Sequence, residues 1–254
     1  MKRLLCSAAC AVVLTVVLGN TAFATTSLEL VVNGVDTVYV SDNGLVQCTG
    51  PDCATAIYPI ADGNAFVGSI ALNGISIDGW LITTSSGGSN SPGCLPSGSG
   101  GPGCLNTSNI NAVSTAGGSL TAYFESDGFT AEPGFTVGYS STGVQTGHEA
   151  SQTAYIGAGA VDLGAGVLAP APVGAACGST LNSLAPGVVA TTTGCGAGGG
   201  TLELETAFIT GPTGGGFNVN GNISAVPEPA AVVLFGTVLA LVASGLRRRG
   251  GKLS

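Results

Sequence analysis

Alternation of apolar and polar residues between positions 25 and 225 is the feature that most constrains the fold of this chain. Leu28, Leu30 and Val32 fall on one phase of the alternation. Successive side chains of a β-strand point to opposite faces, so this period of two predicts half-buried strands. The same pattern recurs at 70–77, 135–139, 202–208 and 217–219, and segments 42–44, 62–64, 78–79 and 127–128 carry the Asp, Asn and Gly of tight turns.

No amphipathic helical period is evident between 25 and 225, so the sequence predicts an all-β domain. Many short strands separated by turns favour an antiparallel β-sandwich of the jelly-roll or immunoglobulin-like kind, and about 200 residues suffice to bury one core. Segment 85–108 is rich in Gly, Ser, Pro and Asn and is expected to be a long surface loop. Weak strands are expected around 161–167 and 188–192.

The N-terminal segment 1–24 has the pattern of a secretory signal peptide. Two basic residues precede an apolar core, and Ala22-Phe23-Ala24 forms a small-x-small cleavage site. We therefore expect the mature protein to start at Thr25 and to be exported across the inner membrane.

The C-terminal segment 226–254 contains an apolar run over 230–246, followed at once by Arg247, Arg248 and Arg249. As a helix this run spans about 26 Å, slightly less than the roughly 30 Å hydrocarbon core of a bilayer. Arginines at the end of such a run remain in the cytoplasm. The pattern predicts a single transmembrane helix that holds the preceding domain on the far side of the membrane.

The motif Val226-Pro227-Glu228-Pro229 directly precedes the apolar run, and its prolines keep it extended. The motif, the short apolar helix and the arginine cluster resemble, in this order, the PEP-CTERM sorting signal of Gram-negative bacteria. The resemblance implies that exosortase, a membrane-embedded cysteine protease, processes the tail and delivers the protein to the cell surface or the medium. A plain C-terminal membrane anchor is the alternative, although it leaves the Pro-Glu-Pro unexplained.

The charge distribution separates the two ends of the chain from the rest. Every lysine and arginine lies in the targeting segments, whereas all acidic residues except Glu228 lie between 25 and 226, where His148 is the sole basic side chain. Such a domain has nothing with which to neutralise phosphate, so nucleic acid and anionic membrane surfaces are poor partners and no nucleic-acid binding is predicted. Its acidity favours solubility and weak attraction of divalent cations.

Six cysteines remain after signal removal, in three close pairs, and exported chains oxidise such pairs to disulfides. Proximity along the chain favours the sequential pairing among the 15 that six cysteines allow. Zinc is the alternative ligand, but no pair has two-residue spacing and the chain has one histidine. The predicted bridges are Cys48–Cys53, Cys94–Cys104 and Cys177–Cys195.

Candidate chemistry in the domain is sparse. His148 is not accompanied by a Gly-x-Ser-x-Gly nucleophile motif. Glu203 and Glu205 lie on one face of a predicted strand, where they are expected to be solubilising charges, the alternative being a carboxylate pair for glycoside hydrolysis. Trp80 lies in an apolar run and is expected in the core. The acidic turns at 42–44 and 62–64 do not continue into a calcium-loop pattern.

No catalytic residue, metal site or cofactor is predicted. The targeting ends, the cysteine pairs and the sandwich composition favour an exported, non-enzymatic surface or extracellular-matrix protein. The PEP-CTERM resemblance implies association with extracellular polysaccharide and biofilm. A glycan- or calcium-binding module on the same fold is the first alternative, and a secreted hydrolase is the second.

Overall fold

A computed structural model describes residues 26–42, 44–63, 68–90, 104–132, 134–142, 149–157, 175–177, 193–195, 198–225 and 237–239. The predicted signal peptide and its cleavage site, the sorting motif and the arginine cluster lie outside the described residues, as does His148. So do the weak strands expected around 161–167 and 188–192. Residues 237–239, inside the predicted transmembrane segment, are helical. Within the described residues, no helix is long and apolar enough to cross a membrane.

The described chain is built from strands and one short 3₁₀ helix, which confirms the all-β prediction. The strands are β1 (Thr26–Val32), β2 (Asp36–Ser41), β3 (Gln47–Thr49), β4 (Ser69–Leu72), β5 (Ile75–Ile77), β6 (Trp80–Asn90), β7 (Cys104–Ser114), β8 (Gly118–Glu132), β9 (Phe135–Thr142), β10 (Glu149–Gly157), β11 (Ala175–Cys177), β12 (Thr193–Cys195), β13 (Gly198–Thr210) and β14 (Gly215–Ala225), and the 3₁₀ helix is η1 (Pro51–Ala54).

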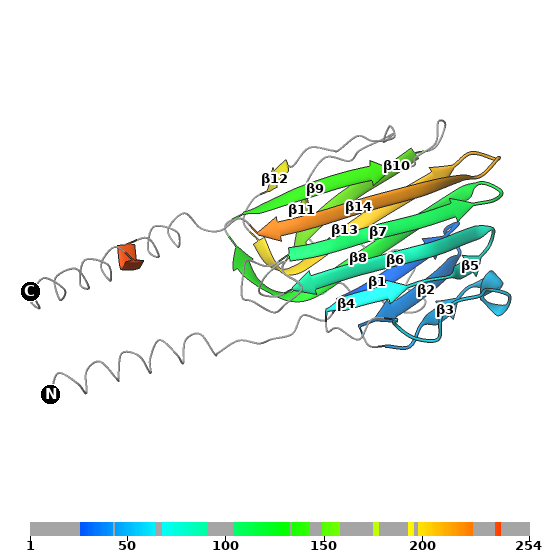
Figure 1. Ribbon diagram of the computed structural model, residues 1–254, viewed down its shortest axis with the longest axis horizontal. Helices are drawn as coiled ribbons and strands as arrows, with labels where there is room; N and C mark the ends of the chain where they lie inside the picture. Colours follow the sequence, from blue (N-terminus) through cyan, green and yellow to red (C-terminus); the bar gives the residue numbers. More distant parts are fainter. Residues whose placement is uncertain are drawn as a thin grey trace, which may run out of the picture.

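These strands form two antiparallel 7-stranded sheets that pack face to face as a β-sandwich (Figure 1). The order in the first sheet is β11-β10-β13-β8-β1-β2-β3. The order in the second sheet is β12-β9-β14-β7-β6-β4, with β5 paired to β6. At each edge of this order lies a strand of only three or four residues, whereas the central β8 has 15.

The core lies between the sheets and is filled by the apolar phase of the alternating strands. Phe208 of the first sheet packs on Phe217 of the second with ring centroids 4.7 Å apart, and Trp80 stacks on Phe217 at 6.3 Å. Trp80 is buried, as predicted. Full burial of such a side chain contributes about 1.5–3 kcal/mol, so this aromatic cluster is a principal link between the two sheets.

The prediction of a loop over 85–108 is wrong at both ends of that segment. β6 continues to Asn90 and β7 begins at Cys104, and the two strands pair as far as Asn90 with Cys104. Glycine and serine are poor strand formers in isolation, but a ladder with a neighbouring strand outweighs that preference. Residues 91–103 lie outside the described part of the chain.

The predicted turn at 127–128 is also wrong, because both residues lie inside β8. There β8 faces β13, and the pairing register shifts near Gly200, which marks a bulge or irregularity in place of a turn. The turn at 78–79 is confirmed. It joins Ile77 to its partner Trp80 through two residues with positive φ, 42° at Asp78 and 77° at Gly79, as a type I′ hairpin requires.

Candidate functional site

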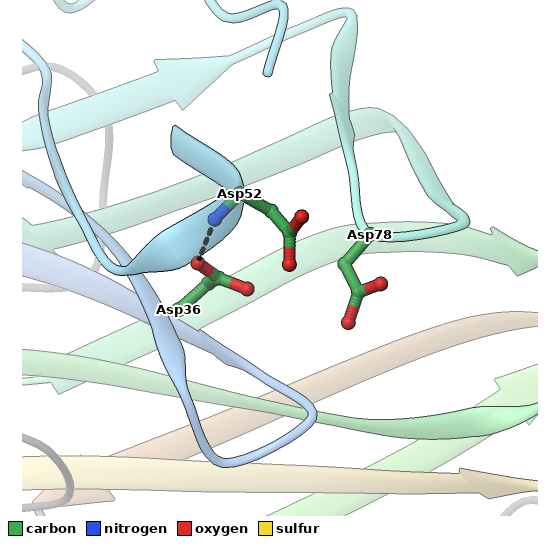
Figure 2. A group of neighbouring side chains, drawn as sticks. All are labelled: Asp36, Asp52 and Asp78. Carbon is green, nitrogen blue, oxygen red and sulfur yellow. Dashed lines mark hydrogen bonds between the residues drawn. The ribbon is translucent and has the colours of Figure 1, made fainter. Parts of the chain in front are cut away.

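Three aspartates from separate parts of the chain meet at one end of the sandwich (Figure 2). Asp36 opens β2, Asp52 lies in η1, and Asp78 lies in the turn between β5 and β6. One carboxylate oxygen from each lies within 4.8 Å of the others. We call these residues the aspartate cluster.

Asp36 is the buried member of the aspartate cluster. It occupies the same phase of β2 as Val38 and Val40, which belong to the core, and it has no exposed surface. Its Oδ1 accepts a hydrogen bond of 2.9 Å from the backbone N–H of Asp52. Its Oδ2 has no hydrogen-bond partner among the described residues. Figure 2 shows this oxygen turned toward the side on which the carboxylates of Asp52 and Asp78 lie.

The segment that carries Asp52 is held against β2 by a disulfide and a glycine. Cys48 of β3 is bonded to Cys53 of η1, which confirms that predicted bridge. Gly50 has a φ of 129°, and a Cβ at this position would lie 2.3 Å from Asp36 Oδ1 and 2.7 Å from the Val35 carbonyl oxygen. Glycine therefore permits the close approach that brings Asp52 over Asp36.

Asn33 fixes the turn that carries Asp78. Its side-chain amide donates to Asp78 Oδ2, while its Oδ1 accepts a hydrogen bond of 2.8 Å from the backbone N–H of Ser119 at the start of β8. The β1–β2 turn of the first sheet is thereby linked to the β5–β6 turn of the second. Asp78 is exposed to solvent, so the cluster runs from the buried Asp36 to the molecular surface.

The aspartate cluster concentrates negative charge without a compensating basic side chain, because no lysine or arginine occurs between 26 and 225. Desolvation raises the pKa of Asp52 above its usual value, and the negative charges of Asp36 and Asp78 raise it further. A close group of carboxylates of this kind provides the hard oxygen ligands that calcium prefers in proteins.

The acidic turns singled out by the sequence use their carboxylates differently. Asp42 Oδ2 accepts a hydrogen bond of 2.7 Å from the backbone N–H of Gly68, and Asp62 Oδ1 accepts one of 2.9 Å from that of Ala71. Both side chains therefore satisfy backbone donors and fix the segment that leads into β4.

A second acidic group covers the outer face of the first sheet, on the centre of β1, β8 and β13. The pairing register places Glu29 opposite Tyr123, and Tyr123 opposite Glu205. In the neighbouring row, Glu203 lies between Glu125 and Tyr155. We call the four glutamates and two tyrosines the glutamate face: Glu29, Glu125, Glu203, Glu205, Tyr123 and Tyr155.

The glutamate face is largely buried, which corrects the prediction that Glu203 and Glu205 are solvent-facing charges. They do share one face, but Glu203 is only 1% exposed, and both of its carboxylate oxygens lack a hydrogen-bond partner within the described part of the chain. Burial raises the pKa of Glu203 to about 7, with further contributions from the negative charges of Glu205 and Glu29. Strand alternation fixes which face a side chain occupies, not whether that face is open to water.

Glu205 is half-buried and accepts a hydrogen bond of 3.0 Å from the Tyr155 hydroxyl. Burial, this hydrogen bond and the charges of Glu205 and Glu203 raise the pKa of Tyr155 to about 12. Burial and the surrounding carboxylates also raise the pKa of Tyr123. Both tyrosines therefore remain neutral hydrogen-bond donors throughout the physiological pH range.

The other two predicted disulfides involve cysteines that the structure describes only in part. Cys94 lies outside the described residues, and only the backbone of Cys104, Cys177 and Cys195 is described. β11 and β12, which end at Cys177 and Cys195, lie next to each other although they belong to different sheets. The bridges Cys94–Cys104 and Cys177–Cys195 stay predictions.

Sequence reasoning did not single out Asp36 or Asp52. A signal for Asp36 was present, because it continues the apolar phase of Val38 and Val40, where a carboxylate needs compensation. Nothing in the sequence indicated that Asp52 and Asp78 converge on it, since they come from a disulfide loop and from a turn of the other sheet.

No protein-family model matches the chain, and no curated protein matches it. Among solved structures it is similar to a carbohydrate-binding module of the β-sandwich superfamily, at 10% identity and a TM-score of 0.31, over 80% of this chain and 73% of the module. It is also similar to the infectious bursal virus T=1 particle protein, at 18% identity and a TM-score of 0.15, over 81% and 63% of the two chains. At these TM-scores neither likeness identifies a family.

Proposed function

We propose that this chain is an exported, non-enzymatic β-sandwich protein of the cell surface or extracellular matrix. The Cys48–Cys53 disulfide is the observation that carries the proposal. Disulfides of this kind form and persist in oxidising compartments outside the cytoplasm. The acidic domain, which has no lysine or arginine between 26 and 225, fits a soluble extracellular protein that does not bind nucleic acid.

Sorting by exosortase is the second element of the proposal. The Pro227-Glu228-Pro229 motif, the apolar run and the arginine cluster support transient anchoring in the membrane, followed by cleavage and delivery outside the cell. Extracellular polysaccharide is the proposed partner after release, in keeping with the PEP-CTERM resemblance.

Replacement of Pro227, Glu228 and Pro229 by alanine in the native host tests the sorting step. We expect the variant to accumulate in the membrane fraction at a higher molecular mass than the released protein. Pro212→Ala, in the exposed turn between β13 and β14, is the control and should be released normally. Unchanged release of the triple variant would show that the motif is not a processing signal and would leave a plain anchor.

The non-enzymatic role is tested with purified protein and a panel of bacterial polysaccharides. We expect no hydrolysis, and binding to at least one neutral polysaccharide on a glycan array. Hydrolysis that disappears in the Glu203→Gln variant would overturn the proposal in favour of a secreted hydrolase.

A further inference from the structure

The aspartate cluster carries an inference that is independent of the proposed function. We infer that Asp36, Asp52 and Asp78 form a calcium site that fastens the β3–η1 segment and the β5–β6 turn to the start of β2. The ligand class is a hard divalent cation, and the site is distinct from the acidic turns at Asp42 and Asp62.

The first argument is the state of Asp36. A carboxylate with no exposed surface loses its hydration, and that loss has to be offset by hydrogen bonds or by a cation. One oxygen of Asp36 has the Asp52 N–H, whereas Oδ2 has no hydrogen-bond partner among the described residues and is turned toward the other two carboxylates (Figure 2). A cation between the three groups supplies the missing partner.

The second argument is charge. Three carboxylates with oxygens within 4.8 Å of one another repel, and the span 26–225 offers no lysine or arginine to separate them. Hydrogen bonds from Asn33 to Asp78 and from the Asp52 N–H to Asp36 orient two of the carboxylates without neutralising them. Neutralisation therefore has to come from solution.

The third argument concerns the size of the ion. The three carboxylate oxygens lie within 4.8 Å of one another, a separation that a single Ca²⁺ with bonds of about 2.3–2.6 Å to oxygen can bridge. Mg²⁺ requires shorter bonds of about 2.0–2.1 Å and near-ideal octahedral geometry. Three protein oxygens leave further positions for water on the exposed side of Asp78, which Ca²⁺ accepts because its coordination is flexible.

Calorimetric titration of the full-length chain in detergent tests this site. After removal of divalent cations with EGTA and dialysis, CaCl₂ is expected to bind at one site with a Kd of about 10⁻⁴–10⁻³ M, the range of extracellular modules. MgCl₂ should bind more weakly. Absence of saturable binding up to about 10 mM Ca²⁺, ten times the upper end of that range, would overturn the inference.

Substitutions in the aspartate cluster test whether Ca²⁺ binds there. Asp36→Asn and Asp78→Asn should each weaken Ca²⁺ binding at least tenfold and abolish most of the Ca²⁺-induced rise in Tm. Asp78→Asn keeps the positive φ of the turn, because asparagine tolerates that conformation. This variant can therefore be measured even if Asp36→Asn fails to fold. Glu149→Gln, an exposed carboxylate on β10, is the charge-matched control and should bind like the wild type.

The sign of the stability change separates a metal site from a merely structural cluster. In EGTA Asp78→Asn should melt at or above the wild-type Tm, because it removes one of three repelling charges, whereas in Ca²⁺ it should melt below it. Wild-type Ca²⁺ affinity in both Asp36→Asn and Asp78→Asn would overturn the assignment.

Discussion

The aspartate cluster and the glutamate face are two groups of close carboxylates, and they lie in different parts of the sandwich. Both gather carboxylates in a domain that lacks lysine and arginine. The aspartate cluster lies at the end of the sandwich and reaches solvent through Asp78, whereas Glu29, Glu125 and Glu203 are buried on the first sheet. A hydrated cation can reach Asp36 from the exposed side of Asp78, whereas the buried glutamates are expected to take up a proton more readily.

We therefore expect access to solvent, and not the number of carboxylates, to decide how each group is neutralised. Around Glu203, Tyr155 and Tyr123 are neutral, so the glutamate face offers hydrogen-bond donors but no positive charge. Calcium is therefore expected to affect the aspartate cluster, and pH between 5 and 8 is expected to affect the glutamate face.

The largest expected effect is a pH dependence of stability at Glu203. Its pKa is about 7 in the folded chain and 4.5 in its ordinary state, so the folded chain holds this proton to higher pH than the unfolded chain does. The contribution is complete below about pH 4.5 and is lost as pH rises through 7, by about 3 kcal/mol in total. Urea unfolding between pH 5 and 8 measures this loss.

Glu203→Gln should remove most of this pH dependence and raise the free energy of unfolding at pH 8, because the amide cannot ionise. The Ca²⁺-induced shift of Tm should be the same in this variant as in the wild type, since the two groups share no residue. A pH profile unchanged by Glu203→Gln would show that this glutamate is already ionised in the folded chain.

A smaller effect is expected from loss of the Cys48–Cys53 disulfide. Replacement of both residues by serine should lower the free energy of unfolding by about 2 kcal/mol, because the short loop in the unfolded chain is no longer closed. It should also reduce the Ca²⁺ response, since the bridge holds η1 over Asp36, and leave the pH profile of the glutamate face intact.

The matched control is Thr49→Ser, next to Cys48 on β3, which keeps both sulfur atoms. Urea unfolding with and without Ca²⁺ at one pH compares the variants. A Ca²⁺ response that survives loss of the disulfide would mean that η1 keeps its position without the bridge.

The smallest effect is expected from Tyr155→Phe, which deletes the donor of the 3.0 Å hydrogen bond to Glu205. Because Glu205 is half-buried and retains some access to water, the loss should be about 1 kcal/mol. Tyr39→Phe, on the same face, is the control because it removes only the longer contact of 3.4 Å between the Tyr39 and Ser27 hydroxyls, and neither variant should alter Ca²⁺ binding. Equal destabilisation by both would assign the effect to the face in general and not to the Tyr155–Glu205 pair.

Local pattern predicted the type of structure well where strands alternate cleanly. Leu28, Leu30 and Val32 face the core as predicted, and the 78–79 turn forms where Asp and Gly tolerate positive φ. The prediction failed at 85–90, where a Gly- and Ser-rich segment is a strand because β7 supplies the hydrogen-bond ladder. Tertiary pairing of this kind leaves no trace in the composition of a single segment.

The candidate site was less predictable than the fold. The aspartate cluster depends on the approach of η1 to β2 and of the β5–β6 turn to both, which are contacts between distant parts of the chain. The same limit explains the burial of Glu203. Its alternation with Leu202 and Leu204 correctly placed it on the outer face, but a strand's own sequence does not reveal what shields that face.

The short strands at the four sheet edges affect how readily copies of the domain associate with one another. Unpaired edges are templates on which other chains add strands, and brevity is one way in which natural sheets prevent this. Among the described residues, β3, β4, β11 and β12 offer only three or four residues each for such pairing. Brevity at these edges therefore limits edge-to-edge pairing between copies of the domain.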